Sequence, residues 1–283
     1  MDISRELDGI GASYNAFTSK EVTGYYAKAA ATKLDTIMDV VFDIFLNSKL
    51  EAGAMEIERG PINEELRMRR DDPQQHIGRL FEELLYGDQP AGWEIGGTEA
   101  TINAMQAPDL RQWFDTHYVA ENTIIAVAGG IDPEQVKAKV EQLFENIRQA
   151  EKASKLAVVE MQNAPGIKTA SKDVEQLYVS LGVRGYNMFD DRRYPAGLMA
   201  QILGGGMSSR LFDEVRQKRG LAYYVWAGNT NYTDSGYFEV GAGLNQAKAT
   251  EGIKVILAEM AKVAAEGVTQ EELKRVKDHA EGR

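Results

Sequence analysis

One arrangement of elements occurs twice in this sequence, and it constrains the fold more than any other feature. Residues 14–30 and 224–243 each read as two strands joined by a short turn, because both are rich in Tyr, Phe, Val and Thr. Gly24-Tyr25-Tyr26 and Gly236-Tyr237-Phe238 lie at matching positions 212 residues apart, and a long helical pattern follows each hairpin. The sequence therefore predicts a duplicated unit of about 210 residues, far longer than the ~20–50 residues of a solenoid repeat. The alternative is a chance similarity between two hairpin-plus-helix patterns.

The rest of the chain predicts an α+β fold of two homologous domains, each an antiparallel sheet packed by helices. Further strands are expected at 122–128 and 174–183. The linker is placed at 150–171, where periodicity is weak and Pro165-Gly166 occurs, so the domains are expected at 1–149 and 172–283. The expected helices are 32–47, 55–70 (which contains Pro61), 73–86, 108–118, 133–148, 192–203, 208–218, 247–265 and 270–279.

The duplication also predicts that both domains are incomplete in this chain. The second domain opens with a strand and two helices near residues 174–218. Most of their counterparts in the first domain would lie before Met1. The first domain continues through residues 73–148, whose counterparts in the second would follow Arg283. The N-terminal domain is therefore expected to lack its first strand and a helix, and the C-terminal domain is expected to be incomplete at its end.

Composition excludes several classes of function. The chain has 43 acidic and 32 basic residues, a balance that argues against binding nucleic acid, which requires a positive face. It has no cysteine, which removes disulfides, iron–sulfur clusters and thiol catalysis. Its longest apolar runs, such as 124–128, fall far short of a membrane span. The charged N-terminus does not read as a signal peptide, so a cytoplasmic location without membrane attachment is expected.

Two patterns could carry chemistry on residue type alone. Glu58 and Glu65 are seven residues apart, about two helical turns, so both carboxylates can lie on one face and ligate or support a metal ion. The alternative is an ordinary solvated face, because many charged residues surround them. The glycine run at 204–206 lacks the spacing and the lysine of a phosphate-binding loop, and is read as a turn between helices. The three histidines, His76, His117 and His279, are isolated.

Several motifs in sequence order resemble the insulinase/pitrilysin family of zinc peptidases, particularly its bacterial branch similar to the mitochondrial processing peptidases. The resemblance extends along essentially the whole chain. The motifs are Asn15-Ala16-Phe17-Thr18-Ser19-Lys20-Glu21 with Tyr25-Tyr26, Glu58-Arg59 with Glu65 and Asp71-Asp72-Pro73, and Leu203-Gly204-Gly205-Gly206-Met207-Ser208-Ser209-Arg210-Leu211-Phe212 with Arg216 and Arg219-Gly220-Leu221-Ala222-Tyr223.

The resemblance implies a zinc-dependent metalloendopeptidase. In the family, two histidines of a His-x-x-Glu-His motif and a glutamate further along the chain hold Zn²⁺, and the glutamate inside the motif is the general base. Glu65 matches the downstream ligand and Glu58 matches a supporting glutamate of the catalytic site. The His-x-x-Glu-His segment would lie shortly before Met1, which is where the duplication also places a missing helix. The chain alone is therefore expected to be inactive and not to bind zinc tightly.

The resemblance also implies how substrate is held. Asn15, Ala16 and Phe17 match an edge strand that pairs with the substrate backbone, and the alternative is a plain hairpin. Arg216 and Tyr223 match a pair that contacts the substrate carbonyl and stabilises the developing oxyanion, and are otherwise ordinary surface and strand residues. In the family, two such domains close like a clam shell around a peptide or an unfolded segment.

Family members often work as homodimers or heterodimers, so a dimer with a second family member is expected.

Two other functions remain open at this point. The chain could instead be a non-catalytic peptide-binding or scaffold subunit of the family. An unrelated α+β binding module is the remaining alternative. The intact pair of Glu58 and Glu65 argues mildly for the catalytic reading.

Overall fold

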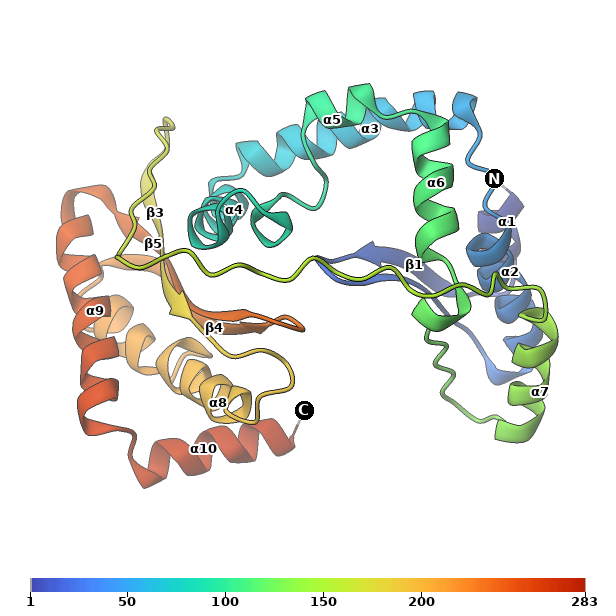
Figure 1. The fold of residues 1–283 in the computed structure, drawn as a ribbon. Helices are drawn as coiled ribbons and strands as arrows, with labels where there is room; N and C mark the ends of the chain where they lie inside the picture. The colour runs from blue at the N-terminus through green and yellow to red at the C-terminus, as the bar shows by residue number, and fades with distance from the viewer. Residues whose placement is uncertain (1, 283) are drawn as a thin grey trace. The chain divides into compact units, whose positions relative to one another are not determined.

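The computed structural model describes residues 2–282, which form two compact units (Figure 1). The first unit comprises the residues up to Leu66 together with Ile95–Leu156, and the second comprises Arg67–Glu94 together with the residues from Ala157 onward. Residues 67–94 are thus grouped with the C-terminal residues, although they lie inside the domain predicted at 1–149. No regular helix or strand occurs at 150–171, where the linker is expected. The predicted domain boundaries themselves stay a prediction.

The first unit begins with a helix and an antiparallel hairpin. Helix α1 (Asp2–Gly9) leads into β1 (Ser13–Thr18) and β2 (Thr23–Lys28), and a short 3₁₀ turn precedes α2 (Leu34–Asn47). The predicted hairpin and the long helix after it are thereby confirmed. The remaining helices of this unit are the part of α3 (Ala52–Asp71) up to Leu66, α5 (Glu99–Ala104), α6 (Ala107–His117) and α7 (Pro133–Leu143).

Aromatic side chains connect the hairpin of the first unit to its helices. The ring of Phe42 on α2 meets that of Phe144 edge-on at a centroid distance of 4.8 Å, and Phe45 lies 5.0 Å from Tyr118. The hydroxyl groups of Tyr25 on β2 and Tyr118 are 2.9 Å apart and share a hydrogen bond. Tyr25, whose ring also meets that of Phe45 edge-on at 6.3 Å, thus packs the hairpin against this small cluster. The two strands have no third strand within the described residues.

The prediction of a strand at residues 122–128 is wrong. Within residues 2–282 this segment pairs with no strand, and the side chain of Ile124 is 94% exposed. Thr123, Ile125 and Val127 are half-buried while their neighbours are exposed, so the segment keeps the alternation of a strand without the ladder. Helix α7 is also shorter than the predicted 133–148.

The second unit is built on a three-stranded antiparallel sheet. The strands β3 (Gln176–Arg184), β4 (Ala222–Asn231) and β5 (Gly236–Asn245) are arranged in the order β3-β5-β4, so the central strand is the last in sequence. The helices of the unit are α4 (Pro73–Tyr86), α8 (Arg193–Gly204), α9 (Ala249–Glu266) and α10 (Gln270–Glu281). A π-helical turn, Phe212–Gln217, replaces most of the helix predicted at 208–218.

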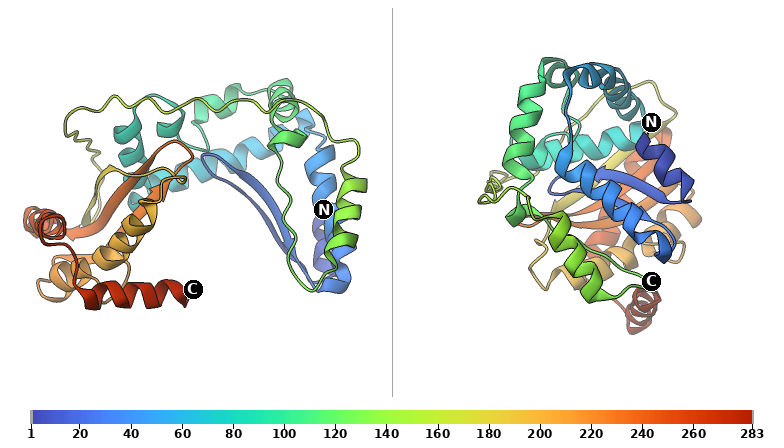
Figure 2. Two further views of the ribbon diagram at one scale, coloured as in Figure 1. Left: turned by 60° about the horizontal axis from the view of Figure 1, so that its bottom comes forward. Right: turned by 90° about the vertical axis from the view of Figure 1, so that its right-hand side faces the viewer.

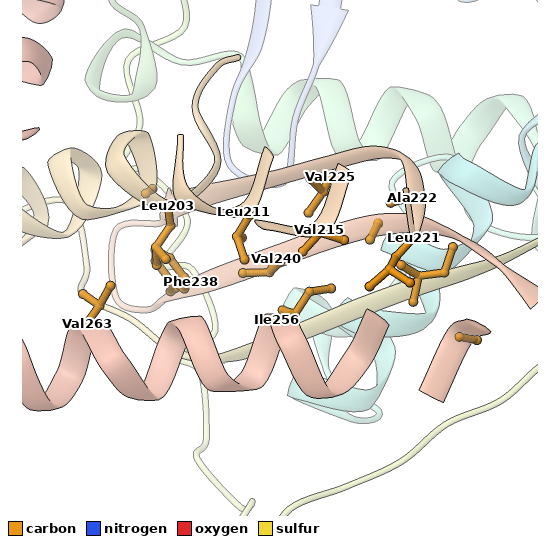
Figure 3. Close-up of a cluster of buried hydrophobic side chains, with 14 residues drawn as sticks. Leu203, Leu211, Val215, Leu221, Ala222, Val225, Phe238, Val240, Ile256 and Val263 are labelled. Atoms are coloured by element: carbon orange, nitrogen blue, oxygen red, sulfur yellow. The ribbon is translucent and has the colours of Figure 1, made fainter. Parts of the chain in front are cut away.

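Successive side chains of the central strand β5 point to opposite faces of the sheet, and other elements pack on both faces. Phe238, Val240 and their even-numbered neighbours face the larger core, together with α8, α9 and the π-helical turn (Figure 3). Tyr237 faces the opposite side, where the ring of Phe81 on α4 meets it edge-on at 5.3 Å. The prediction of an α+β fold with antiparallel sheets packed by helices is confirmed.

The ends of the helices follow from their capping residues. Asp72 accepts hydrogen bonds from the backbone N–H groups of Gln74 and Gln75, and Pro73 starts α4. Gly267 has a positive φ of 75°, which ends α9, and α10 then leaves at a steep angle to it (Figure 2, left). None of the helices within residues 2–282 is long and apolar enough to cross a bilayer.

Candidate functional site

Helix α3 carries the two predicted acidic site residues. Glu58 and Glu65 both lie on it and both are exposed. At about 100° of rotation per residue, their seven-residue spacing leaves them about 20° apart on the same face. Pro61 lies inside the helix between them. The structure therefore brings these two carboxylates onto one surface, as the spacing predicts.

The described residues do not make up a zinc site on their own. Zinc in a catalytic site needs three protein ligands and one open position. Residues 2–282 contain no cluster of three or more His, Asp or Glu side chains that could hold a metal ion. The three histidines lie on α4, α6 and α10, and the ring of His117 lies tilted against that of Trp113 at a centroid distance of 3.9 Å. A carboxylate such as Glu65 is a suitable zinc ligand, but it is one ligand of three.

The face of α3 next to the acidic pair is held by residues 96–105. The guanidinium group of Arg59 donates hydrogen bonds to the backbone carbonyls of Ile102 and Met105 at the end of α5. The side-chain amide of Asn63 donates to Asn103 over 3.0 Å. Sequence reasoning gave Arg59 no role beyond its place in the Glu58-Arg59 motif and among the charged residues around it. Spacing alone does not reveal its role, because α5 is 40 residues away.

Strand β1 carries the predicted substrate-binding residues. Asn15, Ala16 and Phe17 pair with β2 in register, and one edge of β1 has no partner strand among the described residues. The backbone N–H of Ala16 donates to the side-chain oxygen of Asn15 over 2.8 Å. An incoming strand would therefore have to displace the Asn15 side chain from that N–H. Phe17 is half exposed, and its ring lies where a side chain on Gly24 would collide with it.

Arg216 and Tyr223 form a contact pair in the second unit. The guanidinium carbon of Arg216 lies 5.5 Å from the centroid of the Tyr223 ring and 4.9 Å from that of Phe212, which gives two cation–π contacts. Both Arg216 and Tyr223 are exposed. In the part of the chain that the structure describes, neither side chain is hydrogen-bonded to another residue, so their donors are available to a ligand. Their seven-residue spacing does bring them together.

The glycine run before this pair is a turn between helices, as predicted. Helix α8 ends at Gly204, and Gly205 and Gly206 follow in the turn. A Cβ atom on Gly204 would lie 2.1 Å from the backbone nitrogen of Ala227 on β4. The glycine therefore allows the end of α8 to approach the strand closely. This packing explains Gly204 without any phosphate ligand.

Sequence reasoning missed a group of polar side chains between α4 and the sheet of the second unit. The carboxylate of Glu82 accepts hydrogen bonds from the hydroxyl groups of Tyr232 and Tyr237 over 2.9 and 3.0 Å. Glu239 is buried on β5 and accepts a hydrogen bond of 2.6 Å from Ser180. Burial raises the pKa of Glu239, because the charged form is disfavoured away from water. The signal for this group is an acidic residue between apolar neighbours in a strand.

Family profiles match both parts of the sequence. Residues 1–99 match the profile described as insulinase (peptidase family M16), and residues 104–279 match the one described as peptidase M16 inactive domain. An uncharacterized zinc protease of Streptomyces coelicolor is 35% identical over 291 residues, which include 100% of this chain and 63% of that protein. One from Bacillus subtilis is 33% identical and covers 99% of this chain and 68% of its own length.

Solved structures show the same fold. The peptidase M16 inactive domain from Pseudomonas fluorescens superposes with a TM-score of 0.90 at 22% identity, covering 99% of this chain and 68% of its own. A protease from Helicobacter pylori gives a TM-score of 0.90 at 24% identity, covering 99% of this chain and 69% of its own. The chain spans less than two thirds of the length of the Streptomyces relative. From the profile matches and the relatives together, the chain belongs to the insulinase family of zinc peptidases, peptidase family M16.

Proposed function

We propose that this chain is part of a zinc-dependent metallopeptidase that hydrolyses peptides or unfolded segments. The observation that carries the proposal is the pair of exposed carboxylates, Glu58 and Glu65, on one face of α3. Support comes from the relatives, which are named zinc proteases. In this proposal Glu65 is one of the three protein ligands that a catalytic zinc ion needs.

The remaining site residues have separate roles in the proposal. Glu58 supports the catalytic site from the same face of α3. The edge of β1 that has no partner strand within residues 2–282 binds the substrate backbone as an added strand at Asn15, Ala16 and Phe17. Arg216 and Tyr223 donate hydrogen bonds to the substrate carbonyl as negative charge develops on its oxygen. Their support is that both side chains are exposed and stacked with their donors unused by other described residues.

A second candidate function is a peptide-binding subunit without catalysis. Its support is the match of residues 104–279 to a profile that is described as an inactive domain. A dimer with a second family member, a cytoplasmic location and the similarity to processing peptidases also belong to the proposal. The two functions share the β1 edge and differ in whether zinc is bound.

The deciding experiment compares Glu65→Gln with the unsubstituted full-length protein. Zinc content is measured after dialysis, and hydrolysis of a quenched fluorescent peptide is measured in parallel. We expect the substitution to lower zinc affinity by at least about 10- to 100-fold and to abolish hydrolysis, because an amide is a poor zinc ligand. Glu64→Gln is the matched control, since it removes the same charge from the adjacent position of α3.

Each outcome has a definite meaning. Equal zinc content and equal rates in Glu65→Gln and the unsubstituted protein would contradict the assignment of Glu65. If the unsubstituted full-length protein binds peptide but neither binds zinc nor hydrolyses the peptide, the result would support the peptide-binding subunit instead.

A further inference from the structure

Helix α3 has a weak point between its two acidic site residues. Pro61 has no N–H, so the backbone carbonyl of Ile57 lacks its usual helical partner at this position. Proline inside a helix is also the commonest cause of a kink. The orientation of Glu58 relative to Glu65 therefore depends on contacts outside the helix backbone.

Such contacts exist on both sides of Pro61. Before the proline, the Arg59 guanidinium donates to the carbonyls of Ile102 and Met105, which lie at and just beyond the end of α5. After the proline, Asn63 donates to Asn103, and Leu66 packs so closely on Gly96 that a Cβ there would lie 2.8 Å from its Cδ2. We call this set of contacts the α3–α5 brace. Its members are Arg59, Asn63 and Leu66 on α3 and Gly96, Ile102, Asn103 and Met105 opposite.

The chemistry of Arg59 suits this task. Its side chain is only 14% exposed, and its third bond is an ion pair of 3.0 Å with Glu56 one turn earlier. The last carbonyls of a helix carry partial negative charge and have no partner within the helix, so a guanidinium group at that place satisfies them. Arginine presents several donors in a fixed plane, which allows one side chain to hold two carbonyls and a carboxylate together.

The brace lies on a different side of α3 from the acidic pair. At about 100° per residue, Arg59, Asn63 and Leu66 fall within about 60° of one another. Glu58 and Glu65 lie about 100° around the helix from the position of Arg59. The brace can therefore fix the rotation of the helix without covering either carboxylate.

We propose that Arg59 is a positioning residue, which holds the two halves of α3 in register across Pro61 and so fixes the relative orientation of Glu58 and Glu65. The catalytic meaning of this arrangement rests on the proposed function. The mechanical part does not, because it concerns only the contacts of α3 with residues 96–105.

The test is a distance measurement by electron paramagnetic resonance. The chain has no cysteine, so Ala54→Cys and Glu64→Cys give two unique, exposed labelling positions on either side of Pro61. They are about 15 Å apart along the helix, which is within the range of dipolar broadening. We expect Arg59→Ala to widen the distance distribution about twofold, and Arg59→Lys to give an intermediate width. Arg5→Ala, at an exposed arginine of the same unit, should leave the width unchanged.

A second substitution separates positioning from general stability. Pro61→Ala restores the missing backbone bond, so in that background we expect Arg59→Ala to have little effect on the width. Asn63→Ala should widen the distribution in the same direction by a smaller factor, and it serves as the test if circular dichroism shows that Arg59→Ala does not fold. Equal widths in Arg59→Ala and Arg5→Ala would overturn the proposal. So would a widening that is the same with and without Pro61.

Failure of this inference is distinguishable from failure of the proposed function. The label distances need neither zinc nor a substrate, whereas the Glu65→Gln experiment measures zinc and hydrolysis. If Glu65→Gln loses zinc and hydrolysis as expected while Arg59→Ala leaves the label distances unchanged, only the positioning role of Arg59 is contradicted.

Discussion

The two hairpins of this chain share a sequence pattern but differ sharply in burial. In the second unit, β5 is buried along almost its whole length, because β3 and β4 flank it and helices cover both faces. In the first unit, β1 and β2 are mostly exposed and pair only with each other within the described residues. The same pattern of a hairpin, a 3₁₀ turn and a long helix therefore supports a core in one unit and an accessible strand edge in the other.

The second helix after each hairpin, α3 in the first unit and α10 in the second, is also held by different contacts. Helix α10 is anchored near its start by Arg210, whose guanidinium contacts both carboxylate oxygens of Glu272 at 2.6 and 2.8 Å. Helix α3 is anchored by its own Arg59 to the carbonyls of another helix. A charged side chain secures the helix in both units, but in α10 the contact lies at the capped end and in α3 it lies beside a proline.

The largest expected effect tests the difference in burial. Ile256 on α9 is fully buried in the larger core, so Ile256→Ala should lower the free energy of unfolding by about 2–5 kcal/mol through lost contacts and a cavity. Phe17→Ala on β1, which is 52% exposed, should cost about 1 kcal/mol or less. Urea unfolding followed by hydrogen exchange would locate each loss in its unit. Equal costs would contradict the difference in burial between the larger core of the second unit and the first hairpin.

The next effect concerns the ion pair at α10. Arg210 lowers the pKa of Glu272 to about 2 from an ordinary value of 4.5, and Thr269 adds to this by hydrogen bonding. As pH falls, Glu272 is protonated in the unfolded chain at a higher pH than in the folded protein. The ion pair therefore stabilises the second unit above pH 4.5, and its contribution is lost as pH falls towards 2. The contribution should reach at most about 3.5 kcal/mol, since one pKa unit is about 1.4 kcal/mol.

Arg210→Ala should remove most of that acid dependence. Lys274→Ala is the control, because its ion pair with Asp278 is exposed and contributes little. The measurement is unfolding free energy between pH 2 and 6. The same loss of stability on acidification in both variants would contradict the role of Arg210.

The smallest expected effect concerns the buried carboxyl of the second hairpin. The duplication aligns Glu239 with Ala27, so only the second unit buries an acid at this place. Because burial raises the pKa of Glu239, its folded form holds the proton more tightly than the unfolded chain, and stability falls as pH rises through the raised pKa. Glu239→Gln stays neutral and keeps an acceptor for Ser180.

Glu239→Gln should therefore be more stable than the unsubstituted protein above pH 4.5, with a difference that grows and then levels off as pH rises. Thermal unfolding from pH 4 to 9 measures the difference. Glu281→Gln, at an exposed position of α10, should show no such trend. A lower stability of Glu239→Gln at alkaline pH would show that the buried group is needed as a carboxylate.

The sequence predicts most helices and both hairpins because their periodicity is local. The helices predicted to begin at residues 73 and 270 do begin there, and the structure adds that Asp72 and Thr269 cap them. The family resemblance and the α+β class are confirmed as well. Spacing within one helix predicts that Glu58 and Glu65 can share a face, but it does not report the contacts that hold the helix on either side of Pro61.

The errors concern contacts between distant segments. Residues 122–128 have the composition of a strand, but a strand exists only where a neighbour supplies the other half of the ladder. The burial of Glu239 and the hydrogen bonds of Arg59 to the carbonyls of residues 102 and 105 depend on elements 40 or more residues away. No local sequence pattern reports such contacts. The roles assigned to Asn15–Phe17, Glu58, Glu65, Arg216 and Tyr223 stay predictions until the variants are measured.

Within residues 2–282 the segment Thr123–Ala128 pairs with no strand, and this affects how copies of the chain behave toward one another. It is six residues long and uncharged, it contains no proline and it is rich in β-branched side chains, and Ile124 is almost fully exposed. Segments of this composition self-associate readily when their backbone groups are open, because identical copies can stack into a cross-β arrangement. We therefore expect copies of the chain to associate through this segment when its backbone groups are open.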